Sequence, residues 1–128
     1  MKCPCSGKKY EDCCQPFIDG KADAPTAEAL MRSRYTAFVN ANINYLMKTH
    51  HAKTRPTKDK EDILQWAKSV QWMGLTICAT KNGLASNQEG MVEFRALYME
   101  KGQLKEIHEK SLFQKGKGMW FYVSGEHY

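Results

Sequence analysis

The sequence predicts an α+β fold in which helices precede an antiparallel sheet. Between residues 26 and 70, apolar residues recur at helical spacing. From residue 71 onward, runs rich in β-branched and aromatic residues are punctuated by glycines. No strand signal lies between the helices, so a βαβ alternation with a parallel sheet is not indicated. We therefore expect a curved antiparallel sheet with helices packed on one face.

The helical zone divides into three helices. Thr26 is a favourable N-cap for the first, and Asn40 and Asn42 interrupt it before a short second helix over residues 43–50. Pro56 closes that stretch, and a third helix is expected over residues 59–70. The apolar-face positions of the first helix are Ala27, Leu30, Met31, Arg34, Tyr35 and Phe38, and those of the third are Ile63, Leu64, Trp66, Ala67 and Val70.

Four strands are expected to follow the helices. The connectors KNGLASNQEG, EKGQ and KGKG are short and rich in turn residues, so consecutive strands should pair as antiparallel hairpins. Cys78 lies in the apolar run GLTICAT and is expected to be a small buried side chain. The predicted strands occupy residues 71–83, 90–102, 103–118 and 119–125.

Four of the five cysteines lie within CPCSGKKYEDCC, residues 3–14. This segment is too short and polar to bury a core, and four thiolates are a preferred tetrahedral ligand set for zinc. A closed shell of four cysteines is structural, not catalytic. The expected ligands form two arms joined by the loop SGKKYED, with Cys3 and Cys5 in one arm and Cys13 and Cys14 in the other.

Two alternatives to zinc stay open for these cysteines. A disulfide between the adjacent Cys13 and Cys14 would close a small strained ring and would be redox-active, and all four could also be simple reduced thiols. His50 and His51 are conceivable substitute ligands, but they follow the second predicted helix, where a histidine interacts well with the helix dipole.

The residues resemble a known family. CPCSGKKYEDCC resembles the SEC-C motif, and the segments APTAEALMRSRYTAF, WMGLTI and HEKSLFQKGKGMWFYVSG resemble the YchJ family of bacterial proteins. The resemblance implies a zinc-binding knuckle over residues 1–20 and a nuclear transport factor 2-like cone over residues 21–128, with no assigned reaction. One glycine of the usual motif is missing after Cys5, so seven residues separate Cys5 from Cys13 in place of eight.

An acidic residue on the inner face of the sheet marks a candidate pocket. Glu109 alternates with Ile107, Ser111 and Phe113, and is expected to pair with Arg32 or Arg34, or to be hydrogen-bonded by Tyr35 or Ser111. It is part of a structural ion pair, the base or anchor of a ligand pocket, or simply a glutamate that faces outward. The candidate pocket residues are Arg34, Tyr35, Phe94, Tyr98, Glu109, Ser111 and Phe113.

Other conspicuous side chains receive structural interpretations. His108 should point to the opposite, more exposed face of the sheet, unless the register slips by one residue. The large aromatic residues are expected to pack in the core and at its rim. These are Trp66, Trp72, Trp120 and Tyr122.

Composition and charge bear on nucleic-acid binding, membrane insertion and cellular location. The net charge is +5, and the densest basic segment, residues 48–60, contains no aromatic residue for base stacking, which argues against nucleic-acid binding. No apolar run reaches the length of a membrane span, and the amino terminus has no apolar signal core. We expect a soluble cytoplasmic protein whose thiols are kept reduced.

Two functions from different classes follow. In the preferred one, the protein is an adaptor whose zinc knuckle contacts a protein partner; in the rival, the cone binds or converts a small-molecule ligand around Glu109. No catalytic motif is present. A homodimer through the open sheet face is also expected. An adaptor should have its cavity filled by side chains, whereas a ligand-binding cone should have an open cavity at Glu109.

Overall fold

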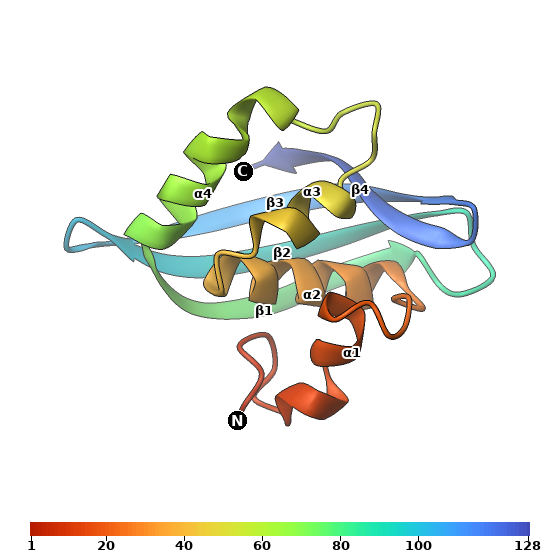
Figure 1. Ribbon diagram of the computed structural model, residues 1–128, viewed down its shortest axis with the longest axis horizontal. Coiled ribbons are helices and arrows are strands. Elements are labelled where there is room, and N and C mark those ends of the chain that lie inside the picture. Colours follow the sequence, from red (N-terminus) through yellow and green to blue (C-terminus); the bar gives the residue numbers. More distant parts are fainter.

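The computed structural model describes residues 1–128 and contains one four-stranded antiparallel sheet. Its strands lie in sequence order, with helices on one side of the sheet (Figure 1). This confirms the predicted α+β class and the hairpin connections. The strands are β1 (Gln71–Asn82), β2 (Glu89–Glu100), β3 (Gln103–Gly116) and β4 (Met119–His127).

The three predicted helices are confirmed as α2 (Ala27–Val39), α3 (Ile43–Lys48) and α4 (Lys60–Ser69). The Thr26 hydroxyl accepts a hydrogen bond from the Ala29 N–H at 3.0 Å and thereby caps α2. The Asn42 side chain caps α3 in the same way. The shorter elements are the 3₁₀ turns η1 (Tyr10–Asp12) and η2 (Thr57–Asp59) and the single-turn helix α1 (Gln15–Ile18). None of the helices is both long and apolar enough to cross a membrane.

The core lies between α2 and the inner face of the sheet. Along β2, burial alternates, so that Val92, Phe94 and Ala96 are buried while Arg95 between them is exposed. These side chains pack against Leu30 and other residues of α2 in one cluster. Burial of one such large apolar side chain contributes about 1.5–3 kcal/mol.

The cysteine segment (residues 1–20) packs against α2. Figure 1 shows it beyond α2, at the N-terminal end of the chain. Cys3, Cys5 and Cys14 are buried, and they belong to the same apolar cluster as the residues between α2 and the sheet. The segment therefore rests on the larger domain and does not form a core of its own.

The prediction that Cys78 is buried is wrong. The pairing of β1 with β2 passes from Ile77↔Phe94 directly to Ala79↔Glu93, so Cys78 is the extra residue of a β-bulge and is exposed. The strand β1 lies at the edge of the sheet, where an apolar run has only one neighbouring strand and one covered face.

Candidate functional site

The four clustered sulfurs have the spacing of a tetrahedral metal site. The Sγ atoms of Cys3, Cys5, Cys13 and Cys14 all lie within 4.8 Å of one another. The separations from Cys5 Sγ are 3.6, 3.4 and 3.5 Å, and Cys13 Sγ lies 3.9 Å from Cys14 Sγ. Four sulfurs bound to zinc at about 2.3 Å would be about 3.8 Å apart. The residues therefore fit a metal ion, and the missing motif glycine does not prevent the four sulfurs from converging.

Two residues of α2 hold this cluster. The Thr36 hydroxyl, fully buried, lies 3.4 Å from Cys14 Sγ and 3.5 Å from Cys3 Sγ. One turn earlier, the Arg32 guanidinium donates to the Cys5 carbonyl at 3.0 Å and pairs with Glu28 at 2.9 Å. Residues four apart share one face of a helix, so this face of α2 is committed to the cysteine segment.

The close packing of the sulfurs also changes their acidity. Hydrogen bonding from Cys14, and more weakly from the other sulfurs, lowers the pKa of Cys5 to about 4. The same shared proton raises the pKa of Cys14, and burial raises the pKa of Cys13. Thiolate character is therefore concentrated on the central sulfur of the cluster.

A second site lies on another face of α2. A cavity of about 340 Å³ opens between the helices and the inner face of the sheet, and 12 of its 17 lining residues are hydrophobic. Met31, Arg34, Tyr35 and Phe38 project into it from α2, at positions i, i+3, i+4 and i+7. Thus α2 separates the sulfur cluster from the cavity and contributes a wall to each.

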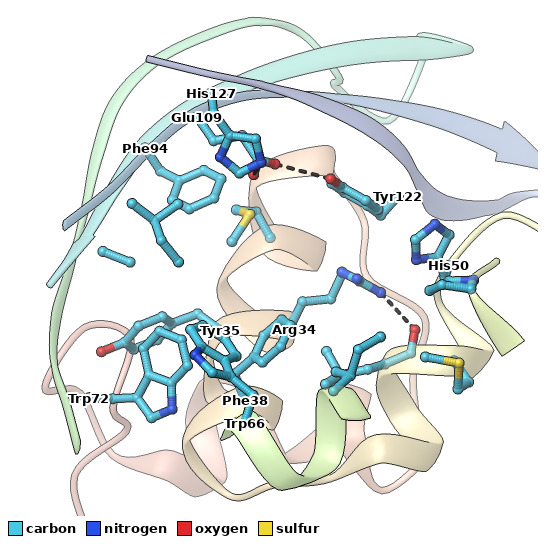
Figure 2. Close-up of a pocket in the computed structure, with 17 residues that line it drawn as sticks. Arg34, Tyr35, Phe38, His50, Trp66, Trp72, Phe94, Glu109, Tyr122 and His127 are labelled. Atoms are coloured by element: carbon cyan, nitrogen blue, oxygen red, sulfur yellow. Dashed lines mark hydrogen bonds and ion pairs between the residues drawn. The ribbon is translucent and has the colours of Figure 1, made fainter. Parts of the chain in front are cut away.

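One end of the cavity is aromatic. The Trp72 ring meets Trp66 edge-on with 5.4 Å between ring centroids, and it meets Tyr35 edge-on at 5.8 Å. Figure 2 shows these rings together on one side of the cavity, with Phe94 projecting from the sheet above them. The Trp72 Nε1 atom is buried without a hydrogen-bond partner. This end suits a flat apolar group.

The other end of the cavity is polar and is dominated by Arg34. Figure 2 shows its side chain extending toward Tyr122 and His50. The guanidinium Nη1 donates to the Leu46 carbonyl at 2.9 Å and to the Thr49 hydroxyl at 2.7 Å, which ties α2 to the end of α3. It also lies 4.7 Å from the centroid of the Tyr122 ring. Burial lowers the pKa of Arg34 to about 10, so the group is still charged at neutral pH.

His50 lines the same polar end in its neutral form. Burial, together with the positive charges of Arg34 and Arg55, lowers its pKa to about 4. Its ring meets the Tyr122 ring edge-on at 5.0 Å. Neither His50 nor His51 belongs to the group of residues that converge on a metal position, where only the four cysteines meet.

Glu109 lies on β3 in the wall of the cavity and is satisfied by residues of the sheet. The Ser111 hydroxyl donates to Glu109 Oε2, as does the Tyr122 hydroxyl at 3.1 Å. On β4, His127 lies directly opposite Glu109 and places its Nε2 3.2 Å from Oε1. The side chain of His127 is 70% exposed, so it stands at the rim of the cavity.

A glycine makes room for the Glu109 carboxylate. A Cβ atom at Gly125 would lie 2.8 Å from Glu109 Cγ and closer still to the carboxylate carbon and oxygen. Gly125 faces Ser111 across the β3–β4 pair. Any larger residue at this position would displace the acidic side chain from its donors.

The expected helix-to-sheet ion pair is wrong. Of the four expected partners of Glu109, only Ser111 binds it; Arg32 turns toward the cysteine segment and Arg34 toward α3. Both arginines donate to backbone carbonyl groups of segments that pack beside α2, whereas Glu109 accepts from side chains of β3 and β4. Tyr35 instead packs against Trp72.

The predicted pocket residues separate into two groups. Arg34, Tyr35, Phe94 and Glu109 line the cavity. Tyr98, Ser111 and Phe113 do not: Tyr98 packs against Trp66 and Trp72, Phe113 is fully buried, and Ser111 acts through Glu109. His108 faces the outer side, where it pairs with Glu93 at 2.6 Å.

Sequence reasoning missed His127 and assigned Tyr122 to packing alone. The predicted last strand ended at residue 125, whereas β4 continues to His127. Alternation continued past Gly125 places His127 two residues later on the same face, and this signal could have identified it.

Comparison with known proteins assigns the chain to a family. Residues 26–125 match the family model described as YchJ, middle NTF2-like domain. The UPF0225 protein GSU1048 from Geobacter sulfurreducens is 43% identical over 124 residues, which cover 96% of this chain and 77% of that protein. The UPF0225 protein SCO1677 from Streptomyces coelicolor is 46% identical over 125 residues, which cover 97% and 94% of the two chains.

Two solved structures have the same fold over nearly the whole chain. The solution structure of RPA3114, a SEC-C motif containing protein from Rhodopseudomonas palustris, matches with a TM-score of 0.88 and 33% identity, over 98% of both chains. The crystal structure of a SEC-C motif containing protein from Psychrobacter arcticus matches with a TM-score of 0.84 and 33% identity, over 97% of this chain and 81% of that one. The chain therefore belongs to the YchJ family, with a SEC-C-type cysteine segment followed by an NTF2-like domain.

Proposed function

We propose that this protein binds a small molecule in the cavity beside α2, and that a structural zinc ion holds its cysteine segment in place. The observation that carries the first part is the cavity of about 340 Å³ with Arg34 and Glu109 in its wall. Its size lies at the lower end of the usual range for ligand pockets, about 300–1,000 Å³. A cone that served only as a rigid base for protein contacts would gain stability by filling this space.

A cavity-filling variant tests the ligand-binding proposal. Ala96 lies in the cavity wall and is buried, so Ala96→Leu puts three additional carbon atoms into the cavity. Ala79 on β1 is exposed, and Ala79→Leu is the matched control. In a ¹H–¹⁵N NMR screen of small aromatic and aliphatic compounds, hits on the wild type should be lost in Ala96→Leu and kept in Ala79→Leu. Hits that survive Ala96→Leu, or a complete absence of hits, would contradict the proposal.

The zinc proposal rests on the sulfur spacing and on the fixing of the segment by Thr36 and Arg32. The four cysteines would hold zinc in a closed set of ligands. The ion would stabilise the segment and take no part in a reaction. Native mass spectrometry of reduced protein should find one zinc ion per chain. Cys13→Ser should lose it, whereas Cys78→Ser, outside the cluster, should keep it. Metal-free protein with two hydrogens fewer would favour the redox alternative instead.

A protein partner for the cysteine segment stays a prediction and is the second candidate function. It is favoured by Lys2, Lys8 and Lys9, which are all exposed, with Lys2 and Lys9 opposite each other in an isolated β-bridge. Such a basic surface suits an acidic partner. A photo-crosslinking residue at position 8 should give one discrete adduct in cells, and Lys2→Glu with Lys9→Glu should remove it. The same adduct from a crosslinker at the exposed Lys68 would contradict this role.

The homodimer also stays a prediction. The outer face of the sheet carries the ion pair Arg95–Glu106 and the hydrogen-bonded pair His108–Glu93, so a contact through it would be partly polar. Sedimentation at several concentrations gives the oligomeric state directly, and a single monomeric species would remove the dimer from the account.

A further inference from the structure

Arg34 is a buried cation without an ion-pair partner. Only 6% of its surface is exposed, and none of the salt bridges in the molecule includes it. Its two hydrogen bonds both come from Nη1. A guanidinium has five N–H donors, so Nε and Nη2 retain donors in a wall of the cavity. A buried charge of this kind is costly unless something compensates it.

Glu109 does not supply that compensation by direct contact. Its carboxylate already accepts from Ser111 and Tyr122 and pairs with His127. Tyr122 stands between the two charges, because its hydroxyl bonds Glu109 while its ring faces the Arg34 guanidinium. The neutral His50 adds no charge to this end of the cavity at neutral pH. The free donors of Arg34 are therefore available to a ligand.

The opposite end of the cavity sets the shape of that ligand. Tyr35, Trp66, Trp72 and Phe94 surround it, and none of them carries a charge (Figure 2). A ligand that fills the cavity consequently needs an apolar, preferably flat, body and one polar end. A phosphate dianion would require more positive charge than one guanidinium offers, whereas a carboxylate matches one guanidinium in charge and in planar geometry.

From these contacts we infer that the cavity binds a small amphipathic carboxylate, with its anionic group on Arg34 and its apolar body against Phe94 and the tryptophans. This inference rests on the proposed ligand-binding function and adds the chemical class of the ligand. The expected role of Glu109 is therefore reversed. Its carboxylate is already hydrogen-bonded by residues of the sheet, and Arg34 anchors the ligand instead.

A series of three probes of equal size tests the inference. The probes are 2-naphthoate, 2-naphthamide and 2-naphthylmethylammonium, measured by isothermal titration calorimetry at pH 7 on full-length reduced protein. A charge-assisted hydrogen bond is stronger than a neutral one, so the anion should bind at least about tenfold more tightly than the amide. The cation should bind most weakly, because it would face Arg34.

Variants separate the role of Arg34 from the general effect of removing an arginine. Arg34→Met should abolish the preference for the anion, whereas Arg95→Met, which removes an exposed arginine on the outer face, should keep it. If Arg34→Met fails to fold because its bonds to α3 are lost, Glu109→Gln decides. Removal of the negative charge near the anchor should tighten 2-naphthoate binding and leave 2-naphthamide binding unchanged.

The outcomes distinguish this inference from the proposed function. Binding of all three probes with equal affinity, or preference for the cation, together with loss of binding in Ala96→Leu, would overturn the carboxylate assignment and leave the cavity as a ligand site. Weaker 2-naphthoate binding in Glu109→Gln would overturn it in the same way. Failure of the wild type to bind any of the three would overturn the inference, and the NMR screen with Ala96→Leu would then decide the proposed function separately.

Discussion

Thr36→Val is a sharp test of how α2 supports the sulfur cluster. Valine has nearly the same volume as threonine, so at this fully buried position it removes only the hydroxyl that lies 3.4 Å from Cys14 Sγ and 3.5 Å from Cys3 Sγ. Loss of a hydrogen bond to a metal ligand commonly lowers metal affinity about 10–100-fold. That change corresponds to about 1.4–2.8 kcal/mol at 1.4 kcal/mol per factor of ten.

The assay is competition for zinc between the reduced protein and a chromophoric chelator at pH 7. We expect Thr36→Val to release zinc at a chelator concentration at least about tenfold lower than the wild type requires. Thr76→Val, which makes the same change at an exposed position of β1, should behave as the wild type does. Equal zinc affinity in Thr36→Val and the wild type would show that the hydroxyl contributes nothing to metal binding by the sulfurs.

Three further predictions follow from the remaining contacts. Gly125→Ala should destabilise the protein by about 1–3 kcal/mol in chemical denaturation, since the new Cβ overlaps Glu109; the cost should shrink in a Glu109→Ala background, and an unchanged cost would contradict the clash. His50 has a folded pKa of about 4, below its ordinary 6.5, so the unfolded chain binds more protons between these values and stability should fall as the pH falls from 6.5 to 4. In His50→Gln, the loss of unfolding free energy between pH 6.5 and 4 should be smaller by about 1–2 kcal/mol, a figure reduced for solvent screening at this half-buried site. If the stability of His50→Gln falls with pH in parallel with that of the wild type, His50 is not the group responsible. Removal of zinc should increase amide hydrogen exchange in residues 1–20 and in the Thr36 turn of α2 while leaving β2 and β3 protected; exchange confined to the cysteine segment would argue against the contact through α2.

Local signals in the sequence were sufficient for the elements of the fold. Thr26 and Asn42 cap helices through their own side chains, and glycine-containing connectors produce hairpins between neighbouring strands. The convergence of four cysteines within twelve residues was predicted from their clustering together with the resemblance to the SEC-C motif. These features depend on interactions between residues close in the chain, which a sequence displays directly.

The contacts between distant segments could not be predicted in the same way. Alternation identified Glu109 as a buried inner-face residue, yet its partners depend on which donors the strands bring close, and Arg34 bonded to α3 instead. The bulge at Cys78 shifts the register of β1, and no proline or glycine at that position indicates it in the sequence. His127 was missed because β4 continues beyond Gly125, where the predicted strand ended. Each of these depends on tertiary geometry that period and composition do not encode.

A crystal structure of the reduced, zinc-loaded protein with 2-naphthoate would show whether the cavity beside α2 receives a ligand whose charged end meets Arg34. We predict the carboxylate on Nε or Nη2 of Arg34 and the naphthalene ring between Phe94 and Trp72, with the bonds of Glu109 to Ser111 and Tyr122 unchanged. A cavity closed by side chains, or a probe bound on the outer face of the sheet, would rule out a ligand site at Arg34.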